Sequence, residues 1–259
     1  MLTAMLWGLA GGSTLVLGSL IGCFTRLPRH VTAAIMAIGA GVLISSVAYE
    51  LVAEAAVMAS LRTVALGLGL GSLTFFLGDL AITRSGGSNR KRSSVPVTAA
   101  SSPAESASGS AGVAAAGTTG AALALGALLD GLPESAAIGV TMVQGGTPSA
   151  AFVAAVALSN LPEGLSSSVG MRRRGHGVRF ILAIWVGIAI ASSIAAGIGY
   201  AAMGDAGPGT NAFVLAFAAG AVLTMLASTM LPEAVQEGGP MVGLLTTAGF
   251  LAAVVLDRL

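Results

Sequence analysis

Two similar short segments place carboxylates inside apolar sequence. Residues 128–136 read Leu-Leu-Asp-Gly-Leu-Pro-Glu-Ser-Ala and residues 157–165 read Ala-Leu-Ser-Asn-Leu-Pro-Glu-Gly-Leu, so an offset of 29 superimposes their Leu-Pro-Glu tripeptides. A charged side chain at the centre of a bilayer costs about 2.5–3.5 kcal/mol on insertion scales, and such residues mark ion pathways. Glu134 and Glu163 are therefore the first candidates for cation ligands.

The residues around each glutamate add further oxygen ligands. Proline has no N–H, so the carbonyl four residues earlier, that of Leu129 or Leu158, loses its helical partner. Polar side chains stand three or four residues before each glutamate and share its helix face. Two such segments facing each other would form a cation site, with five candidate side chains: Asp130, Glu134, Ser159, Asn160 and Glu163.

The composition is that of a membrane protein. Of the 259 residues, 55% are hydrophobic and only 9% are charged, and the mean hydropathy is +0.90. Soluble domains carry about 25% charged residues. The apolar sequence comes in blocks of about 20 residues, the length at which a helix crosses the hydrocarbon core. A net charge of +1 does not point to nucleic acid, and the expected surroundings are a lipid bilayer.

The predicted fold is an all-α polytopic membrane protein with eight transmembrane helices. Residues 1–83 hold helices 1–3, residues 84–117 form a flexible cytoplasmic loop rich in Ser, Ala, Gly and Thr, and residues 118–259 hold helices 4–8. Abundant glycine, 37 residues in all, suits close packing of helices in lipid. The apolar blocks are 3–25, 31–55, 61–82, 118–144, 148–171, 179–203, 210–235 and 240–257.

The basic residues predict the orientation of the chain. Ten of the twelve Lys and Arg follow the first, third and fifth blocks, which leaves Arg62 and Arg258 for the other side. The positive-inside rule places the ten in the cytoplasm, so both termini lie outside it. We expect a multi-pass protein of the cell (inner) membrane. The ten residues are Arg26, Arg29, Arg84, Arg90, Lys91, Arg92, Arg172, Arg173, Arg174 and Arg179.

A second internal similarity appears at an offset of 179. It aligns residues 37–55 with residues 216–234, so that Gly41 matches Gly220 and Glu54 matches Glu233. The second and seventh spans run in opposite directions under the charge argument, which makes this an inverted repeat. Inverted repeats with interrupted helices near the midplane are typical of secondary transporters.

Other polar residues are weaker candidates. Glu50 either reaches the ion pathway or lies near the outer interface, and we keep it as a metal candidate. Glu54, Glu233 and Glu237 lie near span ends, where solvated carboxylates are expected. The methionines are expected to pack rather than to bind metal. Walker, Gly-x-Ser-x-Gly and His-Glu-x-x-His motifs are absent, so neither ATP-driven transport nor the commoner hydrolases are supported, and we do not expect an enzyme.

With these features the chain resembles the ZIP (Zrt/Irt-like) metal transporters, close to their prokaryotic branch. Members typically carry His-Asn-x-Pro-Glu-Gly in span four and a similar sequence in span five. Here residues 130–135 read Asp-Gly-Leu-Pro-Glu-Ser and residues 159–164 read Ser-Asn-Leu-Pro-Glu-Gly. The resemblance covers the whole chain by topology, and residues 160–164 are its strongest match.

The resemblance implies that Glu134 and Glu163 are the central metal ligands and that Asn160 occupies a ligand position. Asp130 stands where the family usually has histidine, and Ser159 stands where it often has histidine or glutamine. Gly131 replaces an asparagine. Ser192 stands where many members have a glutamate that completes a second metal position, so a two-metal site is in doubt. Residues 84–117 also lack the histidines that often serve there as a metal trap.

The predicted function is transport of a divalent metal ion into the cytoplasm. The family favours zinc, with manganese, iron and cadmium as other cargoes, while an all-oxygen site shifts weight toward manganese. Members are thought to slide spans one, four, five and six against the other four, as an elevator, and often form homodimers. The main alternative is a membrane-embedded metal sensor or scaffold without transport, and an intramembrane enzyme or a proton-coupled carrier of organic cations fits less well.

Overall fold

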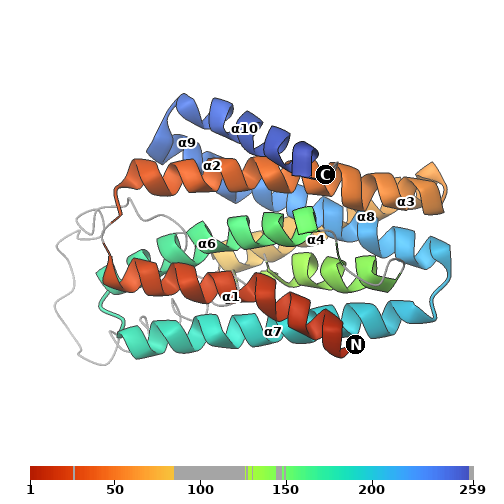
Figure 1. Ribbon diagram of the computed structural model, residues 1–259, viewed down its shortest axis with the longest axis horizontal. Helices are drawn as coiled ribbons and strands as arrows, with labels where there is room; N and C mark the ends of the chain where they lie inside the picture. Colours follow the sequence, from red (N-terminus) through yellow and green to blue (C-terminus); the bar gives the residue numbers. More distant parts are fainter. Residues whose placement is uncertain are drawn as a thin grey trace.

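The computed structural model is a bundle of long helices (Figure 1). It describes residues 1–25, 27–84, 126, 128–129, 131–143, 148 and 150–256. No strand occurs among them, and residues 131–143 form a helical segment in addition to the labelled elements. The labelled elements are α1 (Leu2–Phe24), α2 (Arg29–Ser46), the π-helical η1 (Val47–Val52), α3 (Ala53–Met58), α4 (Leu61–Ile82), α6 (Ala150–Arg173), α7 (Val178–Gly204), α8 (Pro208–Met225), the π-helical η4 (Leu226–Met230), α9 (Leu231–Gly238) and α10 (Met241–Leu256).

Five helical stretches among the described residues are long and apolar enough to cross a membrane. They are Leu2–Phe24, Arg29–Met58, Leu61–Ile82, Val178–Gly204 and Pro208–Gly238. The helix α10 is apolar but shorter, with 16 residues, and α6 has 24 residues but carries more polar side chains. The chain is therefore an all-helical protein whose helices suit a membrane.

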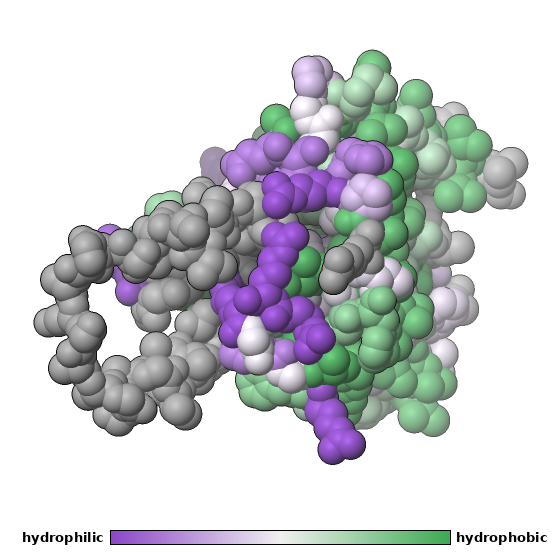
Figure 2. All heavy atoms as spheres, turned by 90° about the vertical axis from the view of Figure 1, so that its left-hand side faces the viewer, coloured by the Kyte–Doolittle hydropathy of each residue, from purple (hydrophilic) through white to green (hydrophobic). Residues whose placement is uncertain are grey.

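The outer surface agrees with this conclusion. Large apolar side chains are exposed along the flanks of the bundle, among them Leu6, Leu66, Ile194, Leu244 and Leu251. Hydrophilic side chains instead gather on one end face, beside a hydrophobic flank (Figure 2). An apolar belt this extensive would be unusual in water and is expected of a surface that faces lipid.

Local sequence explains where the helices begin and end. The side chain of Ser60 caps α4 by accepting a hydrogen bond from the backbone N–H of Thr63 at 3.4 Å. Pro208 opens α8 at a position where its missing N–H costs nothing. Gly239 ends α9 with φ +65°, a backbone conformation that glycine adopts without the steric cost of a Cβ atom. These residues mark helix ends, where the chain reverses direction into the neighbouring helix.

The helices form two packed groups. The first, called the α1 group, contains α1, residues 131–143, α6 and α7. Here glycines bring backbones together: Gly18 lies against the carbonyl of Leu161 in α6, and Gly139 lies against the carbonyl of Ala196 in α7. The amide of Asn160 also donates a hydrogen bond to the Gly11 carbonyl of α1 at 3.1 Å. Small residues thus allow the close helix packing that membrane bundles require.

The second group, called the α2 group, contains the continuous stretch α2–η1–α3, α4, the continuous stretch α8–η4–α9, and α10. Gly41 of α2 lies against the Thr246 carbonyl of α10, and Gly220 of α8 lies against the Leu68 carbonyl of α4. Gly220 follows Gly41 by 179 positions, and Thr246 follows Leu68 by 178. The α2–α10 and α4–α8 contacts therefore use residues at nearly constant spacing.

The α2–η1–α3 and α8–η4–α9 stretches each switch from α to π geometry. The first π-helical segment begins at Val47 and the second at Leu226, 179 positions later. A π-helical turn adds a residue to the turn and so changes which side chains share a face, and such turns are frequent at functional sites. Among the described elements, the main contact between the α1 group and the α2 group joins α6 to α2.

Candidate cation site

Glu163 occupies the middle of α6, directly after Pro162. The helix runs without interruption from Ala150 to Arg173, so the proline removes one hydrogen bond without ending the helix. Gly164 lies against the Leu15 carbonyl of α1, which holds α6 close to α1. Glu163 is half-buried, and one of its carboxylate oxygens is fully buried.

A small cavity lies beside Glu163, between α6, α2 and the α8–η4–α9 stretch. Its volume is about 20 Å³, which accommodates the centre of one ion or water molecule. Four side chains of α6 line it at helical spacing and thus from one helix face. The lining residues are Met36, Ser159, Pro162, Glu163, Ser166, Met225, Thr229, Met230 and Glu233.

Glu233 is the second carboxylate of this cavity, and sequence reasoning missed it. We expected a solvated carboxylate near a span end, but Glu233 is half-buried and one of its carboxylate oxygens is fully buried. It belongs to a third Leu-Pro-Glu tripeptide, residues 231–233, which directly follows η4. That third copy was the signal in the sequence that could have identified Glu233.

Three methionines complete the cavity wall. Met36 comes from α2, Met225 ends α8 and Met230 ends η4. All three also belong to the buried apolar core, as expected for packing residues. Their place beside two carboxylates gives the cavity soft thioether sulfur in addition to hard oxygen.

The other oxygen donors predicted around Glu163 have different roles. Ser159 lines the cavity, and its hydroxyl donates to the Val156 carbonyl at 2.9 Å, which leaves its lone pairs for a cation. The Leu158 carbonyl faces α2, because a Cβ atom on Gly39 would lie only 2.8 Å from it. Leu158 is not among the residues that line the cavity. Asn160 is buried and uses its amide nitrogen to hold α1.

Glu134 is buried in the α1 group, with only 1% of its surface exposed. Ser192 of α7, also 1% exposed, lies near Gly131, since its hydroxyl would be 3.7 Å from a Cβ atom at that position. Asp130 lies outside the described residues. Among the residues that are described, no group of three His, Cys, Asp or Glu side chains is close enough to hold a metal ion.

Glu50 lies in η1 and is half-buried. It does not line the small cavity, which η4 reaches instead. The predicted alternatives for Glu50, an ion pathway or an outer interface, therefore both stay open.

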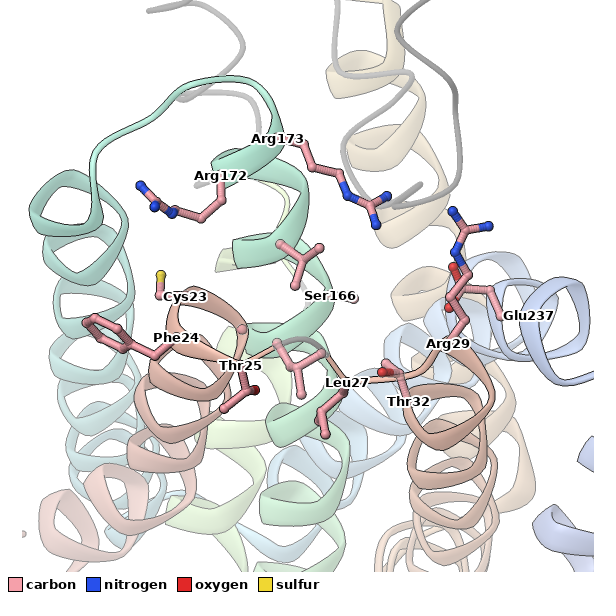
Figure 3. A pocket seen from close by; sticks show the side chains of 13 residues that line it. Cys23, Phe24, Thr25, Leu27, Arg29, Thr32, Ser166, Arg172, Arg173 and Glu237 are labelled. Carbon is pink, nitrogen blue, oxygen red and sulfur yellow. The ribbon is translucent and has the colours of Figure 1, made fainter.

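A second, larger cavity opens at the end of the bundle where α1 and α6 end and α2 begins (Figure 3). Its volume is about 720 Å³. Ser166, one turn beyond Glu163, lines both cavities, so the two cavities are neighbours along α6.

The small cavity is suited to bind a cation. Two carboxylates in low-dielectric surroundings are costly unless hydrogen bonds, protons or a positive ion compensate them, and a cation can compensate both at once.

A comparison of the chain with protein-family models and with curated proteins finds no match.

Proposed function

We propose that this chain is a multi-pass membrane transporter that carries a divalent metal ion into the cytoplasm, as its resemblance to the ZIP family suggests. The observation that carries the proposal is the cavity inside an apolar helical bundle where Glu163 and Glu233 meet hydroxyl and thioether groups. Glu134, buried in the neighbouring helix, is proposed to bind the ion at another stage of its passage, together with Asp130 and Asn160.

The donor set supports zinc as the first cargo. Carboxylates and hydroxyls alone suit manganese or magnesium, whereas thioether sulfur suits softer metals. Zinc accepts both oxygen and sulfur ligands. Met36, Met225 and Met230 therefore shift the expectation back from manganese toward zinc and cadmium, with iron and manganese as weaker alternatives.

Eight spans and an inverted repeat fit the helix contacts. In this arrangement α2–η1–α3 corresponds to α8–η4–α9, and α4 corresponds to α10. The equivalent glycine contacts of Gly41 and Gly220, and the π-helical segments 179 positions apart, support that correspondence. With the basic end of the bundle in the cytoplasm, both termini lie outside.

The proposed transport motion slides the α1 group against the α2 group, as in an elevator. Close glycine–carbonyl contacts join helices within each group, at Gly18, Gly139, Gly41 and Gly220, and one such contact, between Gly39 and the Leu158 carbonyl, joins the two groups. The small cavity lies between the groups, with Glu163 on one side and Glu233 on the other. Sliding would therefore separate the two carboxylates and release the ion.

Uptake by proteoliposomes tests the proposal. Purified protein is reconstituted, and entry of Zn²⁺, Cd²⁺, Mn²⁺, Fe²⁺ and Mg²⁺ is followed with a lumenal dye. We expect saturable Zn²⁺ uptake that Glu163→Gln and Glu134→Gln each abolish, while Asp205→Asn, which changes an exposed carboxylate after α7, retains it. Metal binding without uptake would instead indicate a sensor or scaffold, and neither binding nor uptake would refute a metal site altogether.

A further inference from the structure

The larger cavity has the opposite charge to the one expected of a cation exit. Arg29 lines it at the start of α2, and Arg172 and Arg173 line it from the last turn of α6. The Arg172 side chain lies on the side of Cys23 and Phe24, and the Arg173 side chain points toward Arg29 and Glu237 (Figure 3). Guanidinium groups stay protonated at any physiological pH. Glu237 is the one carboxylate among the described lining residues, so the formal charge of these residues is +2.

The cavity also has the size of a small-molecule site. Its volume of about 720 Å³ lies within the roughly 300–1,000 Å³ that such sites occupy. Thr32 lines it beside the arginines and is buried, with 5% of its surface exposed. The hydroxyls of Thr25 and Ser166 already donate to the carbonyls of Ile21 and Glu163, so the arginines are the main donors. Several guanidinium forks match an anion that has several oxygens, since arginine binds phosphate through two parallel hydrogen bonds.

We propose that this cavity binds a phosphate-bearing anion of small-molecule size, held by Arg29, Arg172 and Arg173. The anion is either a soluble phosphorylated compound or the headgroup of an anionic lipid, because both present the same oxygens. Its site neighbours the cation site, because Ser166 lines both cavities.

A bound anion has a consequence that rests on the proposed transport function. A cation leaving Glu163 by this route passes three guanidinium groups, which repel it. An anion among them supplies compensating negative charge and lowers that barrier. The site would thus regulate the release of metal.

Binding is measured first without any metal. Delipidated full-length protein in neutral detergent is titrated with tripolyphosphate by calorimetry. The double variant R172Q/R173Q should weaken binding by roughly tenfold or more for each guanidinium removed. Arg62→Gln is the matched control, since Arg62 is an exposed arginine at the start of α4, away from this cavity, and its loss should leave the affinity unchanged.

A second arm identifies the source of the phosphate. Protein in nanodiscs containing phosphatidylglycerol is released and its retained lipids are counted by native mass spectrometry, for wild type and R172Q/R173Q. Tripolyphosphate binding indicates a soluble ligand, and arginine-dependent lipid retention without tripolyphosphate binding indicates a headgroup. Either result supports the site.

The proposal is overturned if neither probe binds, if R172Q/R173Q binds as tightly as wild type, or if Arg62→Gln weakens binding equally. Because all three arginines are exposed, their neutral variants are expected to fold, and thermal unfolding verifies it. These measurements contain no metal, so the anion site stands or falls separately from the transport of cations. Uptake of Zn²⁺ with and without tripolyphosphate then tests the regulatory consequence.

Discussion

Replacing Glu233 by glutamine tests whether the small cavity is the cation site. The cavity of about 20 Å³ has room for one ion, which Glu163 and Glu233 would share in the proposed site. At an effective dielectric constant of about 20, a divalent ion and a carboxylate about 4 Å apart attract each other by about 8 kcal/mol. Desolvation of the charges offsets most of this attraction. We expect a net loss of about 2–3 kcal/mol, equivalent to roughly 30- to 150-fold weaker binding.

The assay is equilibrium binding of Zn²⁺ to purified protein in detergent. Glu237→Gln is the matched control, because it makes the same chemical change one turn further along α9 and lines only the larger cavity. Its effect should stay below about threefold, because solvent screens distant charges. If Zn²⁺ affinity is unchanged in Glu233→Gln but falls strongly in Glu163→Gln, the ion binds elsewhere along α6 and the small cavity is not its binding site.

Two further changes probe the helix contacts and the choice of metal. Gly41→Ala and Gly220→Ala should each lower the free energy of unfolding by about 1–3 kcal/mol through overpacking against a neighbouring carbonyl. Gly69→Ala is the control and should not lower the free energy of unfolding, because its added Cβ atom meets no atom within 4 Å. Thermal unfolding measures these changes. A loss of stability in only one of Gly41→Ala and Gly220→Ala would contradict the equivalence of the two contacts. The double variant Met225→Leu/Met230→Leu keeps the side-chain volume but removes both sulfurs, so we expect Cd²⁺ affinity to fall about tenfold relative to Mn²⁺. Competition binding measures this ratio, and an unchanged ratio would exclude the thioethers as ligands.

Hydropathy predicted most helix positions well. The expected block 61–82 coincides with α4 (Leu61–Ile82), and the block 179–203 differs by one residue at each end from α7 (Val178–Gly204). Both segments are mostly apolar and have their few charged residues near the ends, so the length of the apolar block predicts the length of the helix. The predicted loop at 84–117 lies, from residue 85 on, outside the described residues.

The site was harder to predict, because it depends on which helix faces meet. Glu163 and Ser159 were expected ligands, and both line the cavity. Glu233 was assigned to a span end because only its distance along the apolar block was considered. The π-helical η4 precedes it and changes the side-chain register, and helical periodicity taken from sequence assumes a constant 3.6 residues per turn.

The internal repeat at an offset of 179 gives Glu50 and Glu54 a role in the proposed transport mechanism. With the offset of 179, Glu50 corresponds to Thr229 and Glu54 corresponds to Glu233, both of which line the cavity. Glu50 lies in η1 as Thr229 lies in η4, and both glutamates are half-buried. An elevator built from inverted halves needs equivalent groups on both sides of the membrane, because each half serves one of its two end states. Glu50 and Glu54 are thus the side chains expected to meet the moving site when it faces outward.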